Sequence, residues 1–247
     1  MKKYLVSFAV TGLSLLLITG MALAKGDFVT ENEELFVIKD GAKTLVADTN
    51  VYENELNGDR KIYVAYIDSQ NNEAHEGLDN GIYFFSQEGK LVSSLAVENA
   101  DGYSVTFNSD GSRFLLENGE GEYPRYYTFY EFAGLKPGAK CVAWGAGEWV
   151  DNNYFIFTVA DETQMRAENL SVGYQHGRLS VAVYDAAKNE VKILKEATAT
   201  EDYAFSQINE ETGQIDMHKF WVANANDWGN EDKENSDTAS MPVLFNK

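Results

Sequence analysis

The segment Leu35-Phe-Val-Ile-Lys-Asp-Gly-Ala-Lys-Thr-Leu-Val46 places two apolar-rich strands on either side of an Asp-Gly turn, a pattern typical of a β-hairpin. Comparable strand pairs recur at 82–92, 127–143 and 179–194. Their starts are separated by 47, 45 and 52 residues. This period is typical of the four-stranded blades of a β-propeller, so the sequence predicts an all-β repeat fold.

A second kind of strand pair lies between these hairpins. Its clearest copy runs from Tyr103 to Leu116 and turns at Asn108-Ser-Asp-Gly111, whose residues tolerate positive φ. Weaker copies lie at 52–66, 149–159 and 203–222. Each repeat therefore reads as inner strand, turn, second strand, connector, third strand, turn and outer strand, which is the strand order of a blade.

The phase of the repeat at the two ends of the chain predicts how the fold closes. The first strands, in 25–50, have the pattern of a third and an outer strand, whereas 201–222 has the pattern of an inner pair. We therefore expect four blades, 51–100, 101–147, 148–200 and a composite of 25–50 with 201–222, in which Val37 and Trp221 share one sheet. The alternative is an antiparallel β-sandwich, because short strands with frequent turns also describe that fold.

Residues 1–24 are predicted to be a signal peptide rather than part of the domain. Lys2 and Lys3 precede an almost entirely apolar run, and Ala22-Leu-Ala24 is a small-x-small cleavage signal. The alternative is an uncleaved membrane anchor, since the run approaches the length of a spanning helix. We expect a periplasmic or secreted protein without membrane insertion after cleavage. One domain is expected over 25–225.

A polar C-terminal tail is expected over 226–247. Its first part is rich in Asn, Asp, Glu and Ser, a composition typical of flexible segments. It ends in Met241-Pro-Val-Leu-Phe245. We expect this apolar end to dock onto the domain, and the alternative is that it engages a groove of a partner.

The charge of the chain restricts its partners. It has 20 Lys and Arg against 39 Asp and Glu, a formal net charge of −19, and the leader holds two of the lysines and none of the acids. Nucleic acids and anionic membrane surfaces are repelled by such a chain. A protein or a cationic peptide is favoured as partner, although acidity also serves solubility.

The copy from Tyr103 to Phe132 resembles the repeats of bacterial periplasmic propellers of the TolB and WD40-like type. In that pattern an apolar strand ends in an aromatic residue and is followed by Ser-x-Asp-Gly and a second apolar strand; here the matching residues are Phe107-Asn-Ser-Asp-Gly-Ser-Arg-Phe114. The usual proline between serine and aspartate is missing. The resemblance implies a propeller with binding or scaffolding roles, and it transfers no catalytic residue.

In a propeller, the connectors from second to third strand and from outer to next inner strand share one face, which we call the loop face. The first kind are long and chemically mixed here, at 68–80, 117–125 and 161–178. A rigid scaffold commonly presents its functional residues on such loops. We therefore predict that the loop face binds the partner through His75, Glu122, Arg125, Arg166, His176 and Arg178.

Two alternative functions remain open. A calcium-stabilised domain would use the abundant Asp, Glu and Asn oxygens, but no EF-hand spacing occurs. A glycan-processing hydrolase would use Glu148 beside Trp144 and Trp149, as a carboxylate near stacking surfaces. The lone Cys141 has the setting of a buried apolar residue rather than of a nucleophile. We predict no catalytic residue and no required cofactor.

Overall fold

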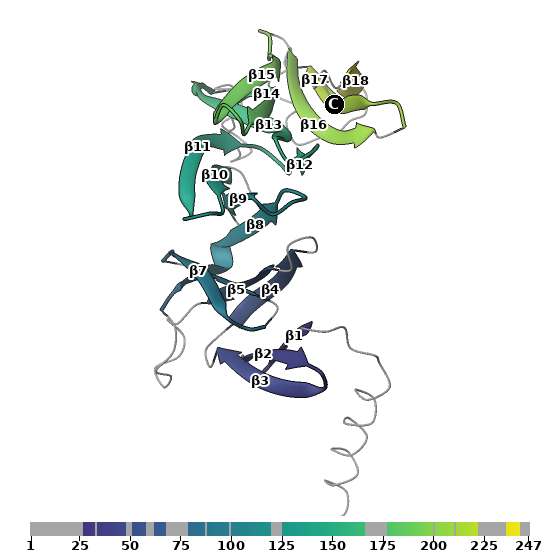
Figure 1. The fold of residues 1–247 in the computed structure, drawn as a ribbon. Helices are drawn as coiled ribbons and strands as arrows, with labels where there is room; N and C mark the ends of the chain where they lie inside the picture. The colour runs from purple at the N-terminus through teal and green to yellow at the C-terminus, as the bar shows by residue number, and fades with distance from the viewer. Residues whose placement is uncertain are drawn as a thin grey trace, which may run out of the picture. The chain divides into compact units, whose positions relative to one another are not determined.

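The structure is a computed structural model. It describes residues 27–32, 34–47, 51–57, 62–67, 79–86, 88–98, 100–119, 125–165, 177–199, 201–209, 211–221 and 236–242. These residues form an all-β protein with one short 3₁₀ turn, Ala100–Gly102 (Figure 1). Within this part of the chain, no helix is long and apolar enough to cross a bilayer. The chain divides into two compact units, one of Met1–Leu56 with Lys61–Ala96 and one of Asn57–Arg60 with Val97–Lys247.

The first unit contains two antiparallel sheets. One has the strand order β1-β2-β3 and the other β4-β5-β6-β7. Strands β5 and β6 are buried along their whole length, which explains why they read as continuous apolar runs. A shared core joins the two sheets, with the Phe28 and Tyr63 rings stacked at 3.8 Å. The strands are β1 (Asp27–Glu31), β2 (Glu34–Lys39), β3 (Ala42–Ala47), β4 (Val51–Asn57), β5 (Ile62–Ile67), β6 (Gly81–Phe85) and β7 (Leu91–Ala96).

The second unit contains one large sheet and one small sheet. The large sheet has the order β15-β14-β13-β11-β10-β9-β8, with β12 paired to β13, and the small one has the order β16-β17-β18. Between β11 and β13, Ala143 and Val159 are paired. The strands are β8 (Tyr103–Phe107), β9 (Arg113–Asn118), β10 (Arg125–Glu131), β11 (Lys136–Ala143), β12 (Glu148–Trp149), β13 (Tyr154–Met165), β14 (Gly177–Asp185), β15 (Glu190–Lys195), β16 (Glu201–Asn209), β17 (Gln214–Trp221) and β18 (Ser236–Pro242).

The predicted strand order within the repeats is confirmed. Strands β4 to β7, β8 to β11 and β12 to β15 each form a group of four strands that neighbour one another in chain order. The turn predicted at Asn108–Gly111 joins β8 to β9, and Gly111 has φ 63°. The alternation read from the sequence therefore identified the hairpins correctly.

The predicted pairing of the first and last segments is wrong. In the described strands, β2 pairs with β1 and β3, and β17 pairs with β16 and β18. Val37 and Trp221 therefore lie in separate sheets. The third strand of each terminal sheet, β1 or β18, comes from a nearby stretch of the chain. Closing such a short loop costs less entropy than pairing the first segment of the chain with the last. The strand pairing that was predicted to close the ring is therefore absent among the described strands, and the number of blades stays a prediction.

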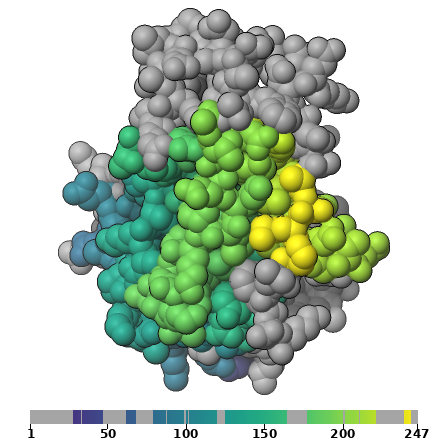
Figure 2. All heavy atoms as spheres, turned by 90° about the horizontal axis from the view of Figure 1, so that it is seen from above, coloured from purple at the N-terminus to yellow at the C-terminus, as the bar shows by residue number. Residues whose placement is uncertain are grey.

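Residues 236–242 of the expected tail form β18. This strand pairs with β17 along its whole length, and it is drawn in yellow in Figure 2. Ala239 and Met241 pack against the core between the small sheet and β13 and β14. Docking onto the domain is thus confirmed for the start of the apolar end, Met241-Pro242, whereas 243–245 lie outside the described residues.

Candidate functional site

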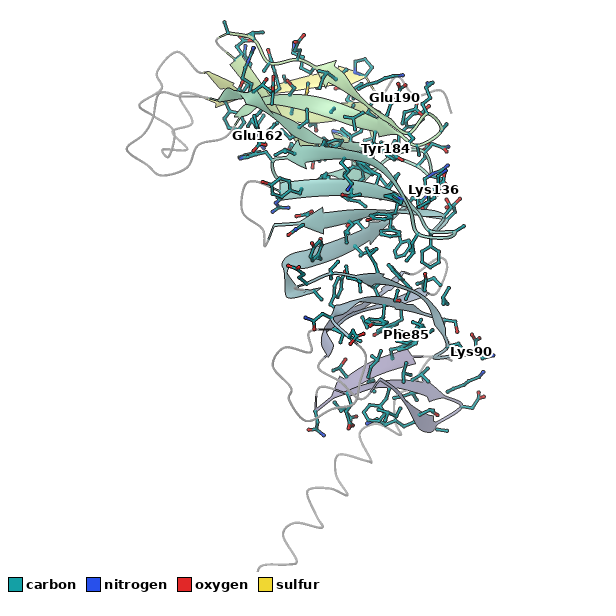
Figure 3. All side chains as sticks on the ribbon, turned by 90° about the vertical axis from the view of Figure 1, so that its left-hand side faces the viewer. Phe85, Lys90, Lys136, Glu162, Tyr184 and Glu190 are labelled. Atoms are coloured by element: carbon teal, nitrogen blue, oxygen red, sulfur yellow. The ribbon has the colours of Figure 1, made fainter. Side chains whose placement is uncertain are left out.

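The loop face of the second unit is held together by backbone and side-chain hydrogen bonds between its connectors. Gly119 N–H donates to the carbonyl of Gly102 at 3.2 Å, which joins the ends of the 119–124 and 97–102 connectors. An Arg178 guanidinium N–H donates to the carbonyl of Ala197 at 2.7 Å. The expectation that both kinds of connector share one face is confirmed in this unit. Figure 3 shows Glu162 at this edge, with Lys136 and Glu190 at the opposite edge.

Arg125 and Glu117 form a half-buried ion pair on the loop face. Arg125 is the first residue of β10, and Glu117 is the residue of β9 directly opposite Tyr127. Arg125 Nη1 lies 2.6 Å from Glu117 Oε1, and the two side chains are only 18% and 16% exposed. Both groups are thus largely removed from water, so their charges interact more strongly than those of a surface pair.

Burial changes the titration of this pair and of its neighbour. Desolvation raises the pKa of Glu117, and the Arg125 guanidinium offsets only part of that increase. The pKa of Tyr127 is also well above its ordinary value, first because of burial and then because of the Glu117 charge. The Tyr127 hydroxyl donates to the carbonyl of Gly145 at 2.8 Å, which ties this cluster to the 144–147 connector. Perturbed groups of this kind are common at functional sites.

Replacing Arg125 by methionine is expected to destabilise the protein more at pH 8 than at pH 4. The raised pKa of Glu117 means that its contribution to stability is full below its ordinary pKa and is lost as pH rises through the raised value. Without Arg125 the pKa rises further, and above it an unpaired carboxylate is buried. Urea unfolding should show a loss of about 1–3 kcal/mol at pH 8 and little at pH 4.

The matched control for this prediction is Lys136→Ala. It breaks the exposed pair with Glu131, whose closest N and O atoms are 3.7 Å apart. Surface pairs contribute about 0–1 kcal/mol, so this variant should change stability little at either pH. A loss at Arg125 that is equal at both pH values would contradict the assigned role of Glu117.

Arg178 lies on β14, next to a close approach of the β14 backbone to β13. Its neighbour Gly177 is buried, and a Cβ there would lie 2.4 Å from the backbone of Asp161, so this position requires glycine. The carbonyl of Ala197 accepts a hydrogen bond from the Arg178 guanidinium. The backbone N–H of Ala197 donates to Ser180 Oγ at 2.9 Å. Arg178 thereby fixes the connector that leads into β16.

A second charged cluster, which the sequence analysis did not identify, lies on β16 and β17. Lys219 Nζ is 2.7 Å from Glu201 Oε1, and the Tyr203 hydroxyl donates to the other Glu201 oxygen. Burial, followed by the hydrogen bond to Glu201, raises the pKa of Tyr203 to about 12. The Lys195 ammonium lies 4.5 Å from the centre of the Tyr203 ring. The sequence signal that could have found it is Glu201, an acidic residue just before the predicted strand pair 203–222.

The six predicted contact residues are only partly described. Arg125 and Arg178 lie on the loop face of the second unit, as stated above. The other four lie outside the described residues, and their role stays a prediction: His75, Glu122, Arg166 and His176.

The second unit contains the residues considered for catalysis, Glu148, Trp149 and Cys141. Glu148 is exposed, and one of its oxygens accepts a long hydrogen bond, 3.4 Å, from Ile208 N–H. Trp149 packs edge-on against Phe129 and Phe155, so it is a core residue here rather than a free stacking surface. Burial raises the pKa of the Cys141 thiol to about 12. In the described ranges no group of three or more His, Cys, Asp or Glu is placed to hold a metal ion.

Comparisons with known proteins address the fold. No protein-family model and no curated protein matches the chain. Among solved structures, a eukaryotic initiation factor is 13% identical with a TM-score of 0.52, and the match covers 90% of this chain and 52% of that one. The β-propeller domain of the Trilobed protease from Pyrococcus furiosus is 10% identical over 88% of this chain and 64% of that one, with a TM-score of 0.44.

TolB from Acinetobacter baumannii is 11% identical over 80% of this chain and 49% of that one, with a TM-score of 0.35. The chain therefore spans about half the length of the initiation factor and of TolB. At these identities the likeness concerns the fold alone. The solved structures similar to this chain include a β-propeller domain and TolB, in line with the resemblance to TolB and WD40-like repeats.

Proposed function

We propose that this chain is an exported propeller-like module that binds a protein partner through its loop face. The observation that carries the proposal is the set of ordered ion pairs on the second unit, Arg125 with Glu117 and Lys219 with Glu201, which hold carboxylates that attract a cationic partner. Arg178 is likewise ordered by its hydrogen bond to a backbone carbonyl. Arginine residues that are already ordered bind at a low entropic cost, and they are enriched among the residues that dominate protein interfaces.

The charge of the chain supports a basic protein or a cationic peptide as the partner. With a formal net charge of −19, long-range attraction speeds the encounter with a positively charged surface and disfavours polyanions. The leader-like segment 1–24 supports export to a periplasm or beyond. Scaffolding is the accompanying role, because propeller folds host many functions and the fold does not choose among them.

Capture of a partner from the native cell envelope tests the proposal. The double variant Arg166→Ala/His176→Ala removes two candidate contacts from one connector of the second unit. Capture is expected to fall at least about tenfold while the melting temperature is unchanged, since truncating a central arginine contact commonly has an effect of this size. Single variants His75→Ala and Glu122→Gln then test two of the four remaining candidates, the other two being Arg125 and Arg178.

The matched control is Lys136→Ala/Lys192→Ala, which removes two side chains from strands β11 and β15. Both lysines are exposed, at positions away from the connectors of the loop face. If this control reduces capture as much as the loop-face variant, binding depends on overall charge and not on the loop face. Unchanged capture in every loop-face variant would overturn the proposal.

A further inference from the structure

Trp144 and Phe220 form an aromatic pair at the loop-face end of the second unit. Their ring centres lie 6.2 Å apart and their planes meet at 78°, an edge-to-face arrangement. Trp144 is the first residue after β11 and belongs to the 144–147 connector. Phe220 is followed by Trp221, which pairs with Glu201, the first residue of β16. Both rings therefore come from positions where strands meet connectors of the loop face.

One buried threonine holds Trp144 in place relative to the sheet that carries Phe220. Thr158 on β13 is 1% exposed. Its carbonyl accepts a hydrogen bond from the Trp144 backbone N–H at 3.0 Å, and its Oγ1 accepts one from the Phe205 N–H on β16 at 2.8 Å. The aromatic pair is thus ordered before a ligand arrives, and such order lowers the entropic cost of binding.

The pair keeps part of its aromatic surface accessible. Trp144 and Phe220 are half-buried, whereas the core rings of Phe155 and Phe157 are at most 1% exposed. The exposed His218 lies beside Phe220, with ring centres 6.3 Å apart. The faces of aromatic rings carry partial negative charge and attract cations, and tryptophan does so most strongly. The accessible part of the pair is therefore suited to a cationic side chain.

The sheet face that carries Phe220 is acidic. Residues directly opposite on antiparallel strands share a face, and Phe220 is opposite Asp202 on β16. Asp216 and His218 lie on the same face of β17, because side chains alternate along a strand. Within β16, β17 and β18 the one Lys or Arg is Lys219, which lies on the opposite face. These strands thus place carboxylates, and no lysine or arginine, on the Phe220 face.

We propose that Trp144 and Phe220 bind a lysine or arginine side chain of the partner through a cation–π interaction. The inference rests on the proposed function and deepens it, since it assigns the contact that recognises a cationic peptide. Charge complementarity supports this occupant. The formal net charge of −19 attracts a basic peptide over a long range, and the aromatic pair supplies the short-range contact.

Titration with a fluorescein-labelled oligolysine peptide tests the site, using the protein recovered after expression with its own leader. Trp144→Leu is expected to weaken binding about tenfold and Trp144→Phe about threefold, because the attraction of a cation falls from tryptophan to phenylalanine and is lost with leucine. Neither change alters the charge of the chain, so the long-range attraction of the peptide stays the same. Phe220→Leu should also weaken binding, and it tests the pair from its other ring if Trp144→Leu does not fold.

The matched control is Phe107→Leu. Phe107 is also half-buried and in edge-to-face contact, with its ring centre 5.5 Å from that of Phe132. It lies at the end of β8 that enters the Asn108–Gly111 turn, away from the loop face. This variant should bind oligolysine like the wild type. Melting temperatures identify any variant that is not folded.

A second titration separates charge from apolar contact. It uses the same peptide with every lysine side chain acetylated, which keeps the apolar stems and removes the positive charge. The wild type and Trp144→Leu should bind this neutral peptide equally weakly. A loss in Trp144→Leu that is as large for the neutral peptide as for oligolysine would show an apolar contact and overturn the proposal. Folded Trp144→Leu and Phe220→Leu variants that bind oligolysine like the wild type would overturn it as well.

Capture from the cell envelope distinguishes this inference from the proposed function. If the Arg166→Ala/His176→Ala variant loses the captured partner while oligolysine binding does not depend on Trp144, the aromatic site alone is wrong. If oligolysine binding depends on Trp144 but no partner is captured in any experiment, the proposed function alone is wrong.

Discussion

Replacing Phe129 by alanine is expected to destabilise the second unit by about 3–5 kcal/mol. Phe129 is 1% exposed and stacks on Tyr184 with ring centres 3.8 Å apart. It also contacts Trp149, Phe155 and Phe157. Truncation would remove the phenyl ring at the centre of this aromatic cluster and leave a cavity beside strands β10, β13 and β14. Urea unfolding followed by tryptophan fluorescence measures the loss, because Trp149 reports on this cluster.

Tyr126→Ala is the matched control for Phe129. Tyr126 also lies on β10, but its side chain is 50% exposed. Surface substitutions away from special contacts usually change stability by no more than about 0.5 kcal/mol. Equal losses for the two variants would show that Phe129 does not occupy the core in solution.

Asn108→Ala is expected to cost about 2–4 kcal/mol, because one side chain satisfies backbone groups of two repeats. Asn108 is 1% exposed, and its Oδ1 accepts from the N–H of Arg113 at 3.0 Å. Its Nδ2 donates to the carbonyl of Asn152 at 2.9 Å, in the turn before β13. Alanine would leave both backbone groups without this partner at a buried position. Thermal unfolding in the pH range near neutrality measures the effect.

Two variants make the Asn108 experiment specific. Ser109→Ala removes an exposed hydroxyl that donates to Asn152 Oδ1 at 2.5 Å, and it should cost less than about 1 kcal/mol. Asn108→Asp keeps the acceptor for Arg113 but replaces the donor to Asn152, so it should be destabilised as well. A fully stable Asn108→Asp variant would contradict the link between the two turns.

Asn108 also shows what the sequence analysis could and could not predict about the fold. The Asn108–Gly111 segment was identified as a turn from residue types that tolerate positive φ, and the structure has φ 63° at Gly111. The contact with Asn152 was not predicted, since it joins turns 44 residues apart. Asp110 N–H also donates to Asn152 Oδ1, at 2.8 Å. The Asn108–Gly111 turn thus also holds the turn that contains Asn152, a role that its own sequence does not predict.

The sequence predicted one residue of the described charged clusters but not its partner. Arg125 was identified from its position at the end of a polar connector, and it does lie on the loop face of the second unit. Its partner Glu117 was not identified, because the pairing requires the register of β9 against β10. The pair of Glu201 and Lys219 was missed for the same reason, since the two residues meet only when β16 and β17 are aligned. Ion pairs across strands depend on register, which is set by the packing of a whole face.

The amino-acid sequence alone determined the strands, the hairpin turns and the repeated strand order, because alternation and turn chemistry are local properties of the chain. Only the tertiary structure decided how the sheets end. Asp27–Glu31 completes the first sheet and Ser236–Pro242 completes the last, although the repeat phase predicted that β2 and β17 would share one sheet. The same strands are compatible with both arrangements. The choice depends on which segment reaches an open sheet edge at the lowest entropic cost while burying Phe28 and packing Met241 against the core.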